Sequence, residues 1–181
     1  MKYIMIARNI GPVAIQLSCL ITLQAFSQDS PKLSDPEVAS VAVVANQIDI
    51  SYAEIAKMRS KDADVLKFAE TMINDHNAVI EKAAALAKKL DVTPKDNDVS
   101  KKLLADAKKT KEMLESKSGD AFNKAYVDNE VTYHKAVIDA VEGLLIPETD
   151  NAELKALLQN VVPALKAHLT HAEMLQKNMH K

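Results

Sequence analysis

The chain has 181 residues, of which 48% are hydrophobic, and this is enough to build one domain with a substantial core. Only three glycines and no tryptophan are present, a composition that favours long helices over a sandwich or barrel rich in tight turns. The 23 basic and 25 acidic residues nearly balance and are spread along the chain, so the sequence lacks the basic face that binding of nucleic acid requires. We therefore expect no nucleic-acid partner.

The first 27 residues have the organisation of a secretion signal. Lys2 and Arg8 give a basic start, an apolar stretch runs from Ile10 to Ile21, and residues 25–27 fit a small-x-small cleavage site. We therefore expect residues 1–27 to be a signal peptide that is cleaved after Ser27, and the protein to be exported. The apolar stretch is too short to be a good membrane span, so we expect no transmembrane segment in the mature chain.

Cys19 leaves a second interpretation of this segment open. A cysteine after a small residue, here Ser18, is the position that becomes lipidated in exported lipoproteins. Gln16 and the continuation of the apolar run beyond Cys19 favour cleavage after Ser27 instead. That cleavage removes the one cysteine of the chain, so the mature protein then has no thiol and no disulfide.

Residues 28–34 form a polar lead-in, and we expect residues 35–181 to fold as a single helical bundle domain. Ser34 and Glu37 have the spacing of a capping box, and Pro36 suits a first turn, so a helix is predicted from here to about Arg59. Its apolar residues recur at helical spacing, at Val41, Val44, Ile48, Tyr52 and Ile55.

A second helix is predicted to start at residues 60–62. Its inward side chains recur in alternating steps of four and three, which is typical of a helix packed within a bundle. These positions are Val65, Ala69, Met72, His76, Val79, Ala83, Leu86 and Leu90.

Residues 91–118 interrupt this periodicity. Pro94 and the acidic residues after it break the helix, and a short lysine-rich helix containing Leu103 and Leu114 is predicted to follow. We interpret the segment as a long, partly helical connection.

Two more long helices are predicted after this connection. The first restarts at Gly119 and ends near Pro147, with an inward stripe of Val127, Val131, His134, Ile138, Val141 and Leu145. Asp150 and Glu153 are predicted as a capping pair for the second, whose stripe is Leu154, Leu158, Val161, Leu165, His168, Ala172, Leu175 and Met179. Four long helices with one long connection between the second and third predict an all-α, ferritin-like four-helix bundle.

Three histidines occupy inward positions on three different predicted helices, namely His76, His134 and His168. Buried neutral imidazoles are good ligands for zinc, copper or iron, so these positions predict one transition-metal site. Nearby acidic residues are candidates to complete the coordination or to hold the imidazoles in place. They are Asp75 and Asp128 first, and then Asp49 and Glu130.

A structural interpretation of the same histidines stays open at this point. Both nitrogens of an inward histidine are often satisfied by carboxylate or backbone partners, and such a buried network can fix the register of helices. On this interpretation the protein is a non-catalytic interaction or scaffold module that captures a partner on an exposed apolar patch.

The last helix offers one further candidate ligand, His171. It lies three residues after His168, and Met174 lies three residues after it, so imidazole and thioether together would suit copper. The sequence has no glycine-rich phosphate loop, HExxH or GxSxG motif, and no catalytic residue is predicted. Pairing of two bundles through an outer stripe, as a homo-oligomer, is compatible with the pattern.

Three segments of the chain together resemble a known family. They are FAETMINDH, which ends at His76, GDAFNKAYVDNEVTYH, which ends at His134, and VPALKAHL, which contains His168. In this order and spacing they resemble the exported bacterial family called domain of unknown function 4142, whose members are often labelled outer-membrane proteins. The resemblance extends from about Asp35 to Met179.

This resemblance implies a ferritin-like bundle in the cell envelope, either periplasmic or peripherally associated with the outer membrane, without an established activity. The acidic position of the family's first helix corresponds to Asp49. The residues that the resemblance assigns to a polar centre are His76, His134, His168, Asp75 and Asp128. We therefore expect a role in metal handling or in tolerance of envelope stress.

Overall fold

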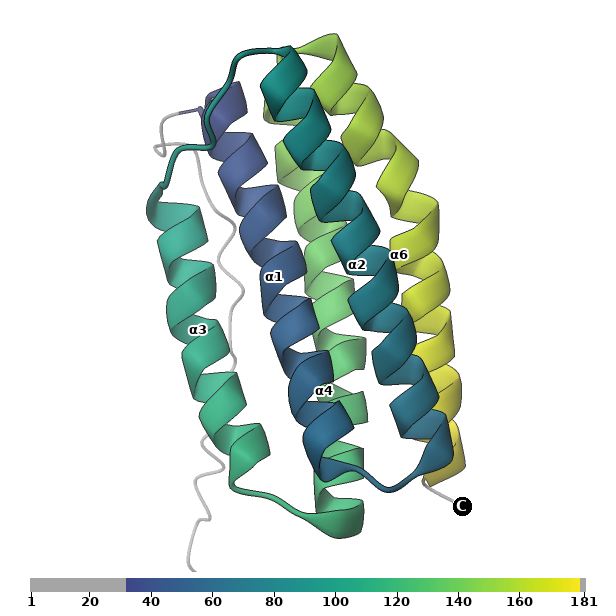
Figure 1. Cartoon of the computed structure of the whole chain (residues 1–181). Coiled ribbons are helices and arrows are strands. Elements are labelled where there is room, and N and C mark those ends of the chain that lie inside the picture. Colours follow the sequence, from purple (N-terminus) through teal and green to yellow (C-terminus); the bar gives the residue numbers. More distant parts are fainter. Residues whose placement is uncertain (1–31, 180–181) are drawn as a thin grey trace, which may run out of the picture. The chain divides into compact units, whose positions relative to one another are not determined.

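The helices of this protein begin and end close to where their capping signals stand in the sequence. The computed structural model describes residues 32–179, and within them every regular element is helical. The long elements are α1 (Asp35–Arg59), α2 (Ala63–Lys89), α3 (Asp98–Glu115), α4 (Gly119–Ala140) and α6 (Ala152–Met179). The predicted all-α class is confirmed (Figure 1).

The start of α1 is the predicted capping box. The Ser34 hydroxyl and backbone N–H both donate to the Glu37 carboxylate, at 2.7 and 3.0 Å, and Pro36 stands in the first turn. Asp62 caps α2 by accepting from two backbone N–H groups of the first turn. Gly119 opens α4 with a φ of 55°, a left-handed conformation that favours glycine.

The prediction that Asp150 caps α6 is wrong, because the capping residue is Asn151. Asn151, rather than Asp150, accepts hydrogen bonds from the backbone N–H groups of Glu153 and Leu154, at 2.9 and 3.0 Å. Asp150 is drawn away because its carboxylate pairs with Lys32 at 2.6 Å. Both residues have suitable side chains, so their contacts outside the helix decide which of them is the cap.

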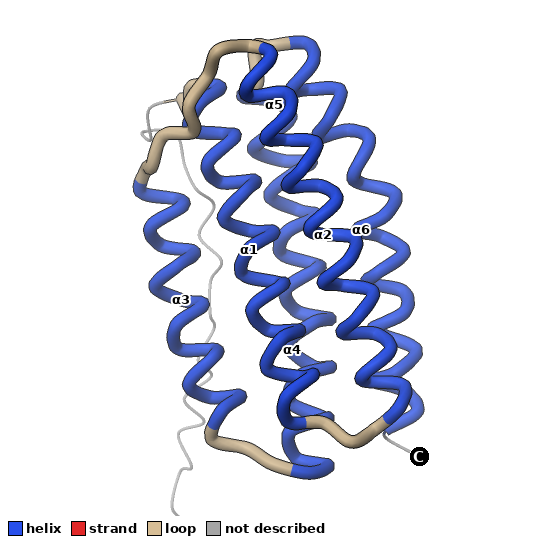
Figure 2. The backbone as a smooth tube through the Cα atoms, in the orientation of Figure 1, coloured by secondary structure: helices blue, strands red, loops and turns tan. Residues whose placement is uncertain are grey.

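The helices are arranged as two antiparallel hairpins joined by a crossover. One hairpin is α1 with α2 and the other is α4 with α6, while α3 connects them in the sequence and lies along the outer side of α1 (Figure 1). The crossover makes α2 and α4 run in the same direction, as in ferritin-like bundles, which confirms the predicted topology. Loops lie at the two ends of the bundle (Figure 2).

Helix α4 ends irregularly, which the sequence did not predict. α4 gives way to a π-helical turn, η1 (Val141–Leu145), and then to a short helix, α5 (Ile146–Glu148). A π turn inserts an extra residue into the helical repeat. Val141 and Leu145, which continue the predicted stripe in steps of three and four, are both buried.

The core consists of two apolar clusters, one in each half of the bundle. The cluster near the α1–α2 turn contains buried residues of α1, α2, α3, α4 and α6, including Tyr52, Phe68 and Tyr126. The cluster near the start of α1 is built from α1, α4, η1 and α6, with Val41 and Leu158 among its members. Between the two clusters lies the layer of the bundle that carries the polar residues described below.

The second half of α2 departs from its predicted stripe. Within this described helix, no side chain from Asn77 to Lys89 is buried, and Val79, Ala83 and Leu86 are only half-buried. The sequence periodicity is therefore present, but the helix does not close against the rest of the bundle there.

Among residues 32–179, no helix combines the length and the hydrophobicity needed to span a bilayer. The predicted signal peptide, the cleavage after Ser27 and the lipidation of Cys19 lie outside the described residues, as does most of the polar lead-in. They remain predictions from the sequence.

Candidate metal centre

The three predicted histidines meet in the middle of the bundle. His76 comes from α2, His134 from α4 and His168 from α6, and their ring centroids lie 5.3 to 5.9 Å apart. All three are buried, with exposed fractions of 4%, 1% and 7%. One nitrogen from each ring lies within 4.8 Å of the other two, which is close enough for a single metal ion to contact all three.

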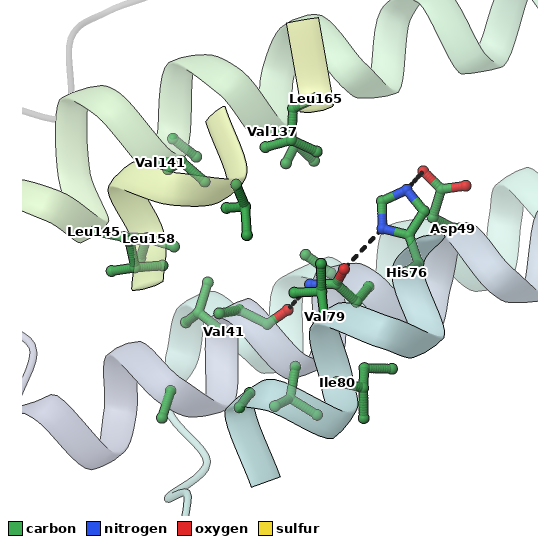
Figure 3. Close-up of a pocket in the computed structure, with 18 of the residues that line it drawn as sticks. Val41, Asp49, His76, Val79, Ile80, Val137, Val141, Leu145, Leu158 and Leu165 are labelled. Carbon is green, nitrogen blue, oxygen red and sulfur yellow. Dashed lines mark hydrogen bonds and ion pairs between the residues drawn. The ribbon is translucent and has the colours of Figure 1, made fainter. Parts of the chain in front are cut away.

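His76 is oriented by a side chain of α1. Its Nδ1 lies 2.7 Å from Oδ1 of Asn46, and Nδ2 of that amide donates to the carbonyl of Ala42 at 2.8 Å. The amide oxygen only accepts, so Nδ1 of His76 must carry the proton. The other ring nitrogen, Nε2, points toward the carboxylate of Asp49 (Figure 3).

The other two histidines are held in the same manner. Nδ1 of His134 donates to the backbone carbonyl of Glu130 at 3.0 Å, and Nε2 of His168 donates to the carboxylate of Asp75 at 2.8 Å. Their remaining nitrogens, Nε2 of His134 and Nδ1 of His168, are left as lone-pair acceptors. Each ring therefore uses one nitrogen to fix its orientation and keeps the other available.

These inward nitrogens are buried without hydrogen-bond partners. Nε2 of His76, Nε2 of His134 and Nδ1 of His168 all fall in this class, as do both carboxylate oxygens of Asp49. A buried polar atom without a partner costs about 1–3 kcal/mol, so folding this cluster without a shared ligand is expensive. A cation placed among these acceptors would contact several of them at once.

Asp49 supplies a negative charge at the centre. It is fully buried on α1, and its Oδ2 lies 3.3 Å from Nε2 of His76 and 3.5 Å from Nε2 of His134. Burial acts to raise the pKa of Asp49, but the neighbouring imidazoles act in the opposite direction, and the net pKa lies below its ordinary value. Asp49 is therefore a carboxylate at neutral pH.

Glu130 behaves differently although it is equally buried. Its Oε2 lies 3.5 Å from Nδ1 of His134, and with Asp49 it forms a second group of closely spaced candidate ligand atoms. Burial, and then the charge of Asp49, hold the pKa of Glu130 well above its ordinary value. Glu130 is thus a neutral carboxylic acid beside the anionic Asp49.

Burial also lowers the pKa of His134 and of His168. Both rings are then neutral near pH 7, the protonation state that binds a metal ion. The centre thus combines a buried carboxylate with neutral imidazoles.

The sequence as a whole matches one family model, described as a domain of unknown function (DUF4142), over residues 22–175. The chain belongs to this family. The family predicted from the three histidine segments is confirmed, and its description assigns no activity. No curated protein sequence matches the chain.

A solved structure with the same fold as this DUF4142 domain is CopM in the Cu(II)-bound form. The TM-score is 0.60, and the match covers 81% of this chain and 98% of that one, with 16% sequence identity. At this identity the likeness supports the helical architecture alone.

The other predicted ligands of the DUF4142 domain fall in different places. Asp75 lies at the rim, with its side chain 52% exposed, and touches the cluster through His168. Asp128 is turned away from the centre, where it accepts from Lys124 at 2.7 Å and from Gln176 at 2.8 Å. The structure instead brings Asp49 and Glu130, which the sequence ranked behind these two, into contact with the histidines.

His171 lies one turn beyond the cluster on α6. Its ring contacts Phe68 edge-on, with centroids 5.0 Å apart, and it belongs to neither group of closely spaced ligand atoms in the described residues. The structure thus gives this histidine an apolar neighbour rather than a share of the centre.

Asn46 is the residue of this site that sequence reasoning missed. It lies three residues before Asp49 on α1, hence on the same face, and this spacing was the available signal. Tyr133 is a further polar neighbour, and its hydroxyl donates to the carbonyl of Ala45 at 2.8 Å. The first helix thus contributes both the charged residue and the hydrogen-bonding residue that lie against His76.

Proposed function

We propose that this DUF4142 protein binds one transition metal ion through Nε2 of His76, Nε2 of His134 and Nδ1 of His168. The carboxylate of Asp49 is the fourth ligand. Asn46 and Asp75 hold two of the rings from outside, as partners of metal-ligating histidines do.

The observation that carries this proposal is that the two nitrogens of each imidazole have different surroundings. In every case one nitrogen donates to an acceptor at the outside, and the other is buried without a hydrogen-bond partner. Two of these inward nitrogens, Nε2 of His76 and Nε2 of His134, lie 3.3 and 3.5 Å from Oδ2 of Asp49. A purely structural network of histidines would be expected to satisfy both nitrogens. The arrangement therefore supports metal binding over the structural interpretation.

The charges support the same conclusion. Asp49 is ionised and fully buried, while His134 and His168 have lowered pKa values and are neutral. An isolated buried carboxylate is costly unless it is paired with a cation. A divalent ion supplies that charge, and the ligand atoms are already in position.

The donor set indicates which ions to test. Three imidazoles and one carboxylate suit zinc in a tetrahedral site and are also good ligands for copper. Iron is less favoured, because ferritin-like di-iron sites are richer in inward glutamates. The similar fold of a Cu(II)-bound protein makes copper the first ion to try. Together with the predicted export, this suggests a role in handling metal, or in tolerance of metal stress, in the cell envelope.

Calorimetric titration of the full chain with Cu²⁺ and with Zn²⁺ tests the proposal. Wild type should bind one equivalent of at least one of these ions. His168→Ala should lose this binding, whereas His171→Ala should retain it, because His171 lies on the same helix and outside the cluster. The pair of variants separates a specific site from general affinity of histidine for metals.

Equal binding by wild type and His168→Ala would overturn the proposal. The histidines would then be structural, and a scaffold function would become the better explanation. Circular dichroism of each variant shows whether the helices remain formed, so loss of binding is not mistaken for loss of folding.

A further inference from the structure

A large pocket adjoins the histidine cluster, in the half of the bundle where α2 packs loosely. Its volume is about 1020 Å³, which is at the top of the range of roughly 300–1,000 Å³ seen for small-molecule sites. Protein interiors normally hold few voids larger than a water molecule. A pocket of this size therefore indicates room for a ligand.

The walls of the pocket are mainly apolar and come from the five long helices, the π turn and the segment that follows α2. Figure 3 shows side chains from α1, α2, α4, η1 and α6 directed toward a common space. They include Val41, Val79, Val137, Val141, Leu145 and Leu158. Walls of this kind favour a ligand that is largely apolar.

His76 and Asp49 stand at one end of the pocket, and Leu145 and Leu158 lie at the other (Figure 3). The lining also includes Asp35 and Asn151, at the starts of α1 and α6. His168 and Leu158, which both line it, are ten residues apart on α6, or about 15 Å at ~1.5 Å per residue. The shape suits an elongated molecule whose polar group lies beside the histidines.

Two departures from regular packing create this space. Within the described helix α2, the residues from Asn77 to Lys89 include none that is buried, and η1 replaces the last regular turns of α4. π-helical turns frequently occur at functional sites. Since Val141 and Leu145 of η1 line the pocket, the irregular turn contributes directly to its wall.

The charged residues around the pocket exclude an anionic ligand. Its lining includes the carboxylates of Asp35, Asp49, Asp75 and Asp106 and the ammonium of Lys82. Asp49 is the one at the end of the pocket beside His76, where its oxygens and Nε2 of His76 are acceptors without donors. A carboxylate or phosphate head would be repelled there, whereas a hydroxyl can donate a hydrogen bond.

We infer that this pocket binds an uncharged long-chain lipid with a hydroxyl at its polar end. The chain lies among the valines and leucines, and the hydroxyl donates to the acceptors beside His76. Affinity grows with the number of methylenes removed from water. The hydroxyl uses acceptors that the proposed metal ion would also occupy, so the inference concerns the metal-free protein and is tested with chelator present.

The test is displacement of the uncharged fluorescent probe N-phenylnaphthylamine from the full-length protein. The wild type should bind the probe saturably, and dodecanol should displace it at least ten times more effectively than dodecanoate. These two competitors have the same chain and differ in their heads, so the comparison isolates the charge argument.

A matched pair of variants locates the binding. Ala83 lines the pocket, whereas Ala85 on the same helix is exposed and lies outside the lining. Ala83→Leu should weaken probe binding at least ten-fold, and Ala85→Leu should leave it unchanged. If Ala83→Leu does not fold, Val137→Phe fills the same space from α4.

Three results would each overturn the inference. The first is that the wild type does not bind the probe saturably. The second is that Ala83→Leu and Ala85→Leu lose probe binding to the same extent. The third is that dodecanoate displaces the probe as well as dodecanol does. None of these results bears on metal binding, which is measured separately by titration.

Discussion

Asn46 accepts a hydrogen bond from Nδ1 of His76 at 2.7 Å, and this contact decides which nitrogen of the imidazole faces the centre. The amide itself is oriented by donating to the carbonyl of Ala42. A side chain of α1 thus fixes the tautomer of a proposed ligand on α2.

Replacing Asn46 with alanine should therefore weaken metal binding without abolishing it. Loss of a partner that orients a ligating histidine costs about 10- to 100-fold in metal affinity. Asn77→Ala is the matched control, because Asn77 is exposed and adjoins His76 on α2. Competition between the protein and a chelator of known affinity measures both variants. Unchanged affinity in Asn46→Ala would show that the amide does not position His76.

Asp49→Asn should lower both the stability of the metal-free protein and its metal affinity. The pKa of Asp49 in the folded protein lies below its ordinary value, so its charge contributes stability at neutral pH, and the substitution removes that charge. The metal-free variant should therefore have a smaller free energy of unfolding than the wild type. Metal affinity should fall by more than the roughly 10- to 100-fold that partners outside the ligand set contribute.

Urea unfolding in the presence of chelator checks the first effect, and metal titration checks the second. Asp139→Asn, an exposed position on α4, should change the free energy of unfolding by no more than about 0.5 kcal/mol. A metal-free Asp49→Asn protein at least as stable as wild type would contradict the view that the neighbouring imidazoles stabilise the Asp49 charge.

Phe68→Ala should be among the most destabilising single changes in the core. Phe68 is fully buried and packs against Tyr126 and His171, with ring centroids 6.3 and 5.0 Å away. Truncating such a ring costs about 3–5 kcal/mol. Met58→Ala, where the side chain is 77% exposed, should have a far smaller effect on the urea midpoint. Similar midpoints for the two variants would argue against the packing seen here.

The capping box of α1 should make stability depend on acid. The Ser34 backbone N–H, the Ser34 hydroxyl and the Lys95 ammonium lower the pKa of Glu37 to about 2 from 4.5. A lowered pKa in the folded state gives stability that is present above the unfolded value of 4.5 and is lost as pH falls through about 2.

Glu37→Gln should therefore be less stable than the wild type at neutral pH. This difference in stability should shrink in acid, where Glu37 of the wild type becomes protonated. The difference in urea midpoint between wild type and Glu37→Gln should narrow as pH falls from 4.5 toward 2. A difference that stays constant over this range would mean that the carboxylate charge of Glu37 does not contribute.

The helical framework could be predicted because its signals are local. Ser34 and Asp62 cap helices through their own neighbours, and inward residues recur at helical spacing. The convergence of His76, His134 and His168 follows from the same periodicity, since each stands on the inward stripe of a helix in one bundle.

The choice of acids could not be predicted in the same way. Asp75 is next to His76 in sequence, yet it lies at the rim, while Asp49 enters the centre from another helix. Which carboxylate enters depends on how α1 is rotated against α2, and sequence spacing within one helix does not specify this. The same applies to Asp128, whose partners Lys124 and Gln176 hold it outside.

The pocket also could not be predicted from the sequence. The stripe of α2 continues through Val79, Ala83 and Leu86 without a break, so its pattern predicts a closed core. In the structure these three side chains are only half-buried, and the π turn at Val141–Leu145 forms part of the wall of the pocket. Both features arise from packing between helices and from backbone hydrogen bonding, which a hydrophobic pattern does not encode.

Elemental analysis of the protein as isolated tests the central claim most directly. The protein is produced with its complete N-terminal sequence and purified without chelator or affinity histidines. We predict close to one equivalent of a single transition metal per chain, lost in His76→Ala, His134→Ala and His168→Ala and retained in His171→Ala. Traces far below one equivalent, unchanged by these substitutions and not increased by adding Cu²⁺ or Zn²⁺, would contradict the assignment of this cluster as a metal centre.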